Sequence, residues 1–222
     1  MRSRSWSVLV TGFVLVPLAV SGPALSLPGG SIAGEIIVQK DGSNKDDRSR
    51  VVVYLEGLVS SPAAHREVHQ RDQTFSPELT VVVKGETIDF PNDDKVFHNV
   101  FSLSEPAKFD LGLYKSGVTK SVAFNQAGVV DVYCNIHPDM SAKVKVVDNG
   151  FFAITGADGR FKIDNVPPGK YPVVAWPVSG DEARGEVEIA PGGAATISLT
   201  VVERPRARTH LRKDGSPYGR YK

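Results

Sequence analysis

Three side chains that can bind a soft or borderline metal lie within seven residues of one another, at 134–140. Cys134 is the only cysteine, His137 is one of five histidines, and Met140 is the only methionine besides the initiator. A thiolate, an imidazole and a thioether together suit copper better than calcium or magnesium, which prefer oxygen ligands. The spacing therefore predicts a metal centre, with copper as the expected ion.

A further histidine that could complete this set lies upstream, at the start of the apolar segment 98–103. Two histidines, one cysteine and a weakly bound methionine form the trigonal ligand set of a blue copper centre that transfers electrons. His98 is therefore the fourth candidate ligand. Because thirty-five residues lie between it and Cys134, the fold must bring the two segments together.

Each candidate ligand also has an ordinary explanation when it is considered alone. A lone cysteine is usually a small buried hydrophobic residue, and a lone methionine usually fills a core. A lone histidine is usually a hydrogen-bonded polar residue. All of these explanations must hold together at this spacing, so the metal centre is the stronger interpretation.

Residues 1–26 have the pattern of a cleaved secretory signal peptide. Arg2 and Arg4 precede an apolar core at 8–20, and Ala24-Leu25-Ser26 is a suitable cleavage site. The core is short for a transmembrane helix, so an uncleaved membrane anchor is the less favoured alternative. We therefore expect an exported, soluble mature protein. Outside the cytosol a single free thiol is prone to oxidation, which favours a cysteine whose sulfur is bound.

The rest of the composition indicates an all-β fold. Glycine (21 residues) and proline (15 residues) are frequent, valine dominates the apolar runs, and no stretch has long helical periodicity. Short strands separated by turns are expected through most of 30–202, with residues 104–118 as a longer loop. The formal net charge of +1 suggests neither nucleic acid nor a membrane as a partner.

Four motifs follow one another in a fixed order between residues 64 and 148. They are Thr74-Phe75-Ser76-Pro77, Gly85-Glu86-Thr87-Ile88-Asp89-Phe90-Pro91-Asn92, His98-Asn99-Val100 and Tyr133-Cys134-Asn135-Ile136-His137-Pro138-Asp139-Met140. In this order they resemble the cupredoxins, and the short ligand loop is most similar to that of amicyanin. The resemblance implies a Greek-key β-sandwich, which we assign to residues 62–149.

The resemblance also implies a function for these residues. It implies one type 1 copper ion bound by His98, Cys134, His137 and, weakly, Met140, in a periplasmic protein that carries single electrons between redox partner proteins.

Residues near the ligands also receive expected roles. Asn99 is expected to connect the two ligand segments through its side chain. His137 is expected near the surface, with Val96, Phe97 and Pro138 around it at the point where the electron leaves.

The segment 150–202 resembles the latter part of a prealbumin-like, carboxypeptidase-regulatory-like sandwich. The motifs that carry this resemblance are Phe152-Ala153-Ile154-Thr155, Ala157-Asp158-Gly159-Arg160-Phe161 and Val166-Pro167-Pro168-Gly169-Lys170-Tyr171. The two strands that normally open such a domain do not precede residue 150, whereas residues 30–61 contain strands of the expected pattern. We therefore predict that the copper domain is inserted into this sandwich, which it splits into 30–61 and 150–202.

Residues 203–222 carry seven Lys or Arg and two acidic residues. The segment lacks apolar periodicity, so we interpret it as a basic, disordered, solvated tail, with His210 exposed. It is the only segment suited to contacting an acidic partner or a membrane surface. His65 and His69 lie four residues apart, but no acid-rich or cysteine-rich cluster surrounds them in the sequence, and we expect no second metal site there.

Two other functions compete with electron transfer. One is copper delivery or storage, and the other is a metal-free β-sandwich that binds or displays a partner. We expect no enzyme, since multicopper oxidases and copper nitrite reductases need many more histidines than the three left here. The chain also has no nucleophile elbow or zinc-protease motif of a hydrolase, and no phosphate-binding glycine loop. Outside the tail, its basic residues form no patch with interspersed aromatic residues of the kind that binds nucleic acid.

Overall fold

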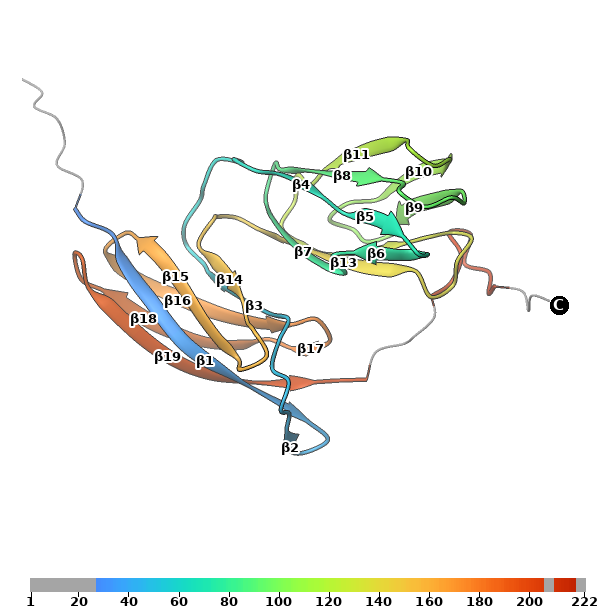
Figure 1. Cartoon of the computed structure of the whole chain (residues 1–222). Coiled ribbons are helices and arrows are strands. Elements are labelled where there is room, and N and C mark those ends of the chain that lie inside the picture. Colours follow the sequence, from blue (N-terminus) through green and yellow to red (C-terminus); the bar gives the residue numbers. More distant parts are fainter. Residues whose placement is uncertain (1–26, 206–209, 219–222) are drawn as a thin grey trace, which may run out of the picture.

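The computed structural model describes residues 27–205 and 210–218 (Figure 1). All regular elements in these ranges are β-strands, arranged as two β-sandwiches that pack against each other. The all-β prediction is confirmed. In the described ranges there is no helix with the length and apolarity to cross a membrane. The predicted signal peptide, residues 1–26, lies outside the described residues.

One sandwich combines strands from the two ends of the described chain. Its strands are β1 (Gly30–Lys40), β2 (Ser43–Asn44), β3 (Val51–Leu55), β14 (Phe152–Ile154), β15 (Arg160–Val166), β16 (Gly169–Pro177), β17 (Gly180–Asp181), β18 (Ala183–Ile189) and β19 (Ala194–Glu203). One sheet has the order β15-β1-β19-β17, with β2 paired to β1, and the other has the order β14-β3-β16-β18. We call this the terminal sandwich.

Strands distant in sequence therefore hold the terminal sandwich together. β1 pairs antiparallel with β15 and parallel with β19, and β3 pairs antiparallel with β14 and β16. The partners lie about a hundred residues apart or more in each of these ladders. Side chains from both sheets, including Ile32, Val53 and Val173, fill its core.

The second sandwich contains the predicted ligands, and we call it the copper domain. Its strands are β4 (His65–Glu67), β5 (His69–Arg71), β6 (Thr74–Ser76), β7 (Leu79–Val83), β8 (Thr87–Pro91), β9 (His98–Ser102), β10 (Phe109–Tyr114), β11 (Thr119–Ala123), β12 (Gly128–Tyr133) and β13 (Ser141–Val147). The sheet β10-β9-β12-β13-β7 packs over the sheet β11-β8-β4, and β5 and β6 form a hairpin.

Strand β10 lies where the sequence analysis expected a loop, at 104–118, so that expectation is wrong for residues 109–114. The strand is irregular, since its register with β9 shifts between Asp110 and Leu113. Gly112 occupies this shift with φ +66°, a left-handed conformation that glycine adopts without steric cost. The bulge breaks the alternation of apolar and polar residues by which a strand is recognised.

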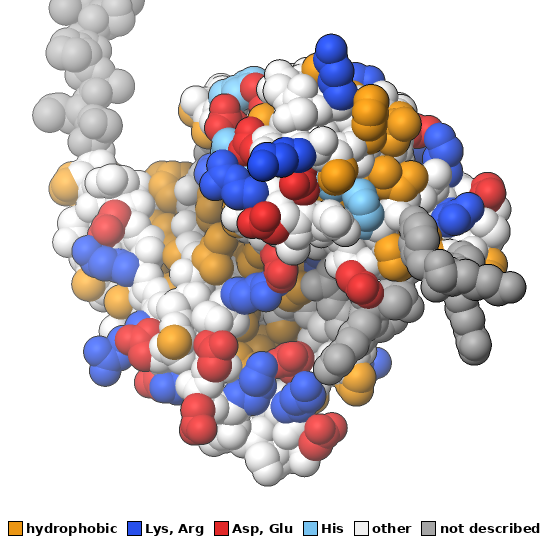
Figure 2. Space-filling model, turned by 45° about the vertical axis from the view of Figure 1, so that its right-hand side comes forward, with side chains coloured by type: hydrophobic (Ala, Val, Ile, Leu, Met, Phe, Trp, Pro, Cys, Tyr) orange, Lys and Arg blue, Asp and Glu red, His pale blue; other side chains and the backbone are white. Residues whose placement is uncertain are grey.

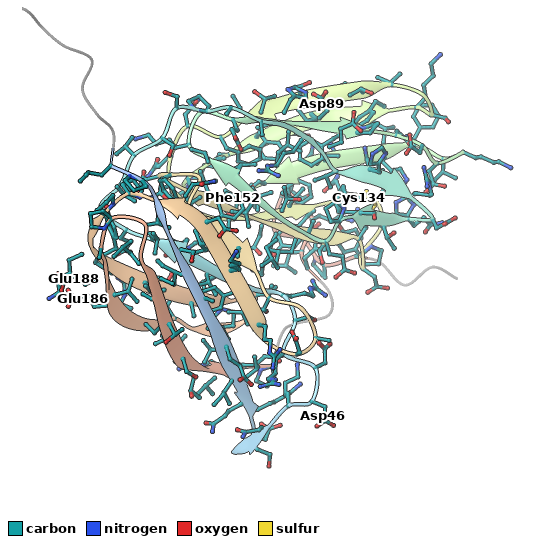
Figure 3. The ribbon with its side chains drawn as sticks, turned by 60° about the vertical axis from the view of Figure 1, so that its left-hand side comes forward. Asp46, Asp89, Cys134, Phe152, Glu186 and Glu188 are labelled. Atoms are coloured by element: carbon teal, nitrogen blue, oxygen red, sulfur yellow. The ribbon has the colours of Figure 1, made fainter. Side chains whose placement is uncertain are left out.

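The two sandwiches share an apolar junction because strand side chains alternate between faces. On β3, Val51, Val53 and Leu55 enter the core of the terminal sandwich, whereas Val52 and Tyr54 point to the copper domain. This explains the uninterrupted apolar run of a strand that is buried on both faces. Figure 3 shows Phe152 at the junction and Cys134 within the copper domain.

The copper domain contributes alternate residues of β7 and one buried lysine to this junction. Leu79, Val81 and Val83 of β7 pack with Val174 and Trp176 of β16, among others. The ammonium of Lys145 lies 4.8 Å from the centre of the Tyr54 ring and 5.1 Å from that of Trp176. Burial lowers the pKa of Lys145, and Glu182, at 3.3 Å, opposes this effect.

We expect Val174→Ala to reduce the free energy of unfolding by about 2 kcal/mol, since it removes two carbons from a fully buried side chain and leaves a cavity. Urea unfolding followed by tryptophan fluorescence measures the change. Val202→Ala is the matched control, because Val202 is 48% exposed and should lose less than 0.5 kcal/mol. Equal losses for the two variants would contradict the junction.

Candidate metal centre

The predicted ligands come from three adjacent strands of one sheet. His98 begins β9, Cys134 directly follows β12, and Met140 directly precedes β13. β9 pairs with β12 through Phe101 and Tyr133, and β12 pairs with β13 up to Tyr133 and Ser141. The sheet thus brings His98 next to the loop that follows β12.

Main-chain hydrogen bonds close the ligand loop, residues 134–140. The N–H of Cys134 donates to the carbonyl of Met140 at 3.1 Å, and the N–H of Met140 donates to the carbonyl of His137 at 3.3 Å. The loop is therefore anchored at both ends and in its middle. Three candidate ligands have little freedom to move independently of the sheet.

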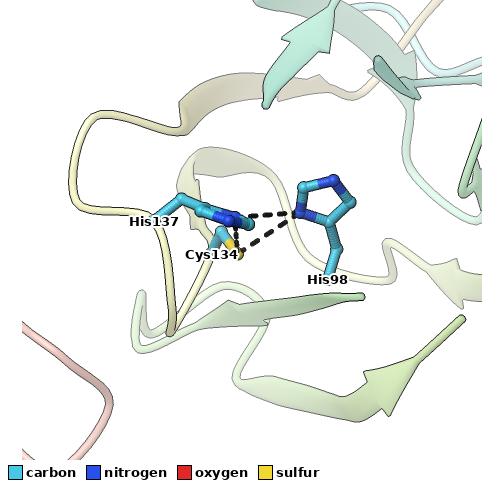
Figure 4. Close-up of side chains that lie close together, drawn as sticks. All are labelled: His98, Cys134 and His137. Atoms are coloured by element: carbon cyan, nitrogen blue, oxygen red, sulfur yellow. Dashed lines mark hydrogen bonds between the residues drawn. The ribbon is translucent and has the colours of Figure 1, made fainter. Parts of the chain in front are cut away.

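Three donor atoms converge at one point (Figure 4). Cys134 Sγ lies 3.8 Å from His98 Nδ1 and 3.5 Å from His137 Nδ1, and the two Nδ1 atoms are 3.1 Å apart. This is the only group of three or more histidine, cysteine and acidic side chains with metal-binding spacing in the described part of the chain. The cluster is the one that the sequence predicts.

Burial divides the four candidate ligands. His98 and Cys134 have no exposed surface, Met140 is buried beside Cys134 in the core of the domain, and His137 is half-buried. Two imidazoles, a thiolate and a thioether form a donor set that fits copper. The four residues form a cluster typical of a type 1 copper site.

The thiol of Cys134 lies in surroundings that favour the thiolate. Burial alone would raise the pKa of Cys134, but a hydrogen bond with His98 and main-chain N–H groups of Asn99, Ile136 and His137 outweigh this effect and lower it. Because a metal ligand must be deprotonated, this environment prepares the sulfur for metal binding.

A carboxylate holds the other side of the His98 ring. Nε2 of His98 lies 3.0 Å from Oδ2 of Asp94, whose oxygens also accept hydrogen bonds from the N–H groups of Gln73 and Lys95. Burial of His98 would lower its pKa, but the contacts with Cys134 and Asp94 raise it. The Asp94 contact places the Nε2 proton toward the carboxylate and leaves Nδ1 free to bind a metal.

Asn99 connects the ligand segments differently from the prediction. Its main-chain N–H, and not its side chain, bonds to Cys134 Sγ. Its side-chain Nδ2 donates instead to Oδ1 of Asp110 on β10, at 2.7 Å. Successive side chains of a strand point to opposite faces, so Asn99 cannot point to the same side as His98.

His65 and His69 do not meet in a shared site. His65 Nε2 lies 2.5 Å from Asp89, whereas His69 lies 2.6 Å from Asp93 and 3.1 Å from Glu67. Each histidine therefore has its own carboxylate partners on the surface. These contacts are acidic partners that the sequence analysis did not expect.

Comparison with known proteins identifies the domain that contains the cluster. The chain is 30% identical over 95 residues to amicyanin-alpha of Methylorubrum extorquens, a match that spans 80% of that protein and 41% of this chain. The chain belongs to the amicyanin-like cupredoxins. The membership rests on the copper domain. No model of a known protein family matches the chain.

Solved structures similar to part of the chain include two cupredoxins. A reduced-state amicyanin variant is 24% identical, with a TM-score of 0.35, and the match covers 98% of that chain and 43% of this one. A purple cupredoxin from Nitrosopumilus maritimus is also 24% identical, with a TM-score of 0.34, covering 99% of that chain and 37% of this one.

A segment near the far end of the chain contacts the ligand loop, which the sequence did not lead us to expect. Residues 210–218 lie against this loop, and His210 stacks on Tyr133 with ring centres 4.2 Å apart. The expectation of a disordered tail with an exposed His210 is therefore wrong for this part of 203–222. Residues 206–209 and 219–222 lie outside the described residues. Charge and composition gave no signal for the docking, because it depends on a few specific contacts.

Asp94→Asn is expected to raise the reduction potential of the copper-loaded protein. The amide still accepts a hydrogen bond from His98, but it removes a negative charge that stabilises Cu(II) more than Cu(I). We expect about a tenfold shift of the equilibrium toward Cu(I), equal to ~59 mV for one electron, in a spectroelectrochemical titration.

The control for this substitution is Asp93→Asn. It removes the same charge one residue away, where the carboxylate pairs with His69 and Arg71 instead. We expect Asp93→Asn to change the reduction potential by no more than about a third of the change caused by Asp94→Asn. Equal shifts for the two variants would show that overall charge, and not the contact with His98, sets the potential.

Proposed function

We propose that the protein is an exported type 1 copper protein that carries single electrons between redox partner proteins. The observation that carries the proposal is the convergence of His98, Cys134 and His137 in a buried cluster with one half-buried member. A metal held there would be shielded from solvent, and the half-buried imidazole of His137 would connect it to the surface. Copper, when bound, would supply the one-electron couple.

The ligand geometry suits this chemistry because the chain holds it in place. His98 is fixed by Asp94 and by its strand, and Cys134 and Met140 are fixed by the hydrogen bonds of the ligand loop. Ligands that move little between the two oxidation states favour rapid electron transfer. The same rigidity would hinder the repeated uptake and release that copper delivery requires.

An apolar surface next to the cluster supports docking of a redox partner. Val96 and Phe97, which directly precede His98, are 41% and 52% exposed, and Leu113 on the neighbouring β10 is 58% exposed. Pro138, which follows His137, is half-buried. Figure 2 shows hydrophobic side chains gathered beside a histidine on the copper domain. We propose this surface, with His137, as the route by which the electron leaves.

The remaining assignments are proposals with separate support. The pairing of β1 and β3 with strands after residue 150 supports a prealbumin-like sandwich split into 30–61 and 150–202 by the domain at 62–149. The signal-like sequence of residues 1–26 supports export, with the periplasm as the proposed location.

Repeated chemical reduction and reoxidation of the copper-loaded protein tests electron transfer against copper delivery. We expect full recovery of the oxidised spectrum over ten cycles in the presence of a Cu(I) chelator, because the buried ligands retain both oxidation states. Copper analysis after desalting gives the metal retained. Loss of most of the copper on the first reduction would contradict electron transfer and favour delivery or storage.

Phe97→Glu tests the proposed docking surface. We expect electron self-exchange, measured by NMR line broadening in mixed Cu(I) and Cu(II) samples, to slow about tenfold or more, since two like charges would meet at the contact. Val59→Glu introduces the same charge at an 87% exposed site and should change the rate less than twofold. An unchanged rate in Phe97→Glu, with both spectra intact, would exclude this surface.

A further inference from the structure

The segment 210–218, which we call the C-terminal clamp, has a defined shape of its own. The N–H of Arg212 donates to the carbonyl of Ser216, and the N–H of Gly215 donates to that of Arg212, both at 2.9 Å. Gly215 has φ +81°, as a tight turn requires. The Arg212 guanidinium lies over the Tyr218 ring, 5.3 Å from its centre. The clamp is therefore a compact turn that presents its side chains together.

The first contact of the clamp reaches the main chain of the cysteine ligand. The Tyr218 hydroxyl donates to the carbonyl oxygen of Cys134 at 2.5 Å. The N–H of Cys134 is already bonded to Met140 within the ligand loop. Both main-chain polar groups of the ligand are thus fixed, one by the loop and the other by the clamp.

The second contact reaches the residues that follow two ligands. The N–H of Lys213 donates to Oδ1 of Asn135, next to Cys134, at 2.9 Å. Its ammonium lies 2.5 Å from Asp110, which also accepts a hydrogen bond from Asn99, next to His98. One residue of the clamp is thereby connected to both ligand segments.

The charge on Asp110 strengthens this connection at neutral pH. Burial would raise the pKa of Asp110, but hydrogen bonds from Lys213, Asn99 and the N–H of Gly112 lower it to about 2. The group is therefore a carboxylate at neutral pH and can pair with the side chain of Lys213. The pair is exposed to solvent, so it adds little to the free energy of folding, and its main effect is to fix where Lys213 lies.

Aromatic packing forms the third contact. The His210 ring stacks on Tyr133, the residue before Cys134, and meets Tyr218 and Phe101 edge-on at 5.3 and 6.2 Å between ring centres. Phe101 and Tyr133 are the paired residues that join β9 to β12. The clamp therefore covers the point where the strand of His98 meets the strand that leads to Cys134.

We infer that the C-terminal clamp is a structural part of the copper centre, in which Tyr218 and Lys213 are positioning residues that hold the ligand loop closed. The inference deepens the proposed function and rests on it for the role of copper. It assigns a task to the terminal sandwich, since the clamp follows β19 of that sandwich and contacts the other domain. Opening of the loop, and with it loss of copper, should be slower when the clamp is in place.

Tyr218→Phe in the full-length protein tests the inference, because it removes only the hydroxyl that holds Cys134. We expect copper transfer from the Cu(II)-loaded protein to excess EDTA to become about fivefold to tenfold faster, as for the loss of one hydrogen bond. The matched control is Tyr171→Phe, which removes a phenol-to-carbonyl hydrogen bond, to Pro168, inside the terminal sandwich. The control should change the transfer rate less than twofold.

Hydrogen exchange of the copper-free protein separates this inference from the proposed function. We expect the amides of Cys134, Met140 and Lys213 to exchange several-fold faster in Tyr218→Phe and to be unchanged in Tyr171→Phe. Unchanged exchange and unchanged copper transfer in Tyr218→Phe would overturn the clamp. Failure of the wild-type protein to form a copper–thiolate site would overturn the proposed function, while the exchange result would still decide whether the clamp holds the loop.

Discussion

The register of β9, β12 and β13 is the constraint on which the rest of the metal centre depends. Pairing of Tyr133 with Ser141 and with Phe101 sets where the ligand loop begins and how close His98 lies to it. Because side chains alternate between faces, a slip of one residue would turn His98 out of the cluster. The apolar core around Cys134 and Met140 makes such a slip costly, since it would expose that core to water.

The terminal sandwich supports this sheet from outside. β7 lies beside β13 in the sheet that carries the ligands, and its alternate residues pack on β3 and β16 of the other domain. The C-terminal clamp adds a second connection at the opposite end of the same sheet. Contacts between the domains therefore lie near the ligand loop and along β7 and β13, so that the second domain can influence the metal centre without providing a ligand.

The sequence was most informative where rare residue types do the chemistry. Cys134, His137 and Met140 stand out because cysteine and methionine are so scarce in this chain, and His98 follows from the chemistry of the set. β10 was not predictable, because the bulge at Gly112 interrupts its alternation. The contacts of Asp94 and Tyr218 were not predictable either, since they join residues whose proximity depends on the tertiary structure. Asn99 was correctly placed near both ligand segments, but the direction of its side chain depends on the strand register.

The most direct test of the copper centre is the visible and EPR spectrum of the mature protein with one equivalent of Cu(II), measured beside Cys134→Ser. We expect the wild type to show an intense thiolate-to-copper charge-transfer band that colours the protein blue and a narrow copper hyperfine splitting, both absent from the variant because they require a thiolate ligand. A pale spectrum that is the same in the two proteins would contradict the account and leave a weak copper binder or a metal-free β-sandwich.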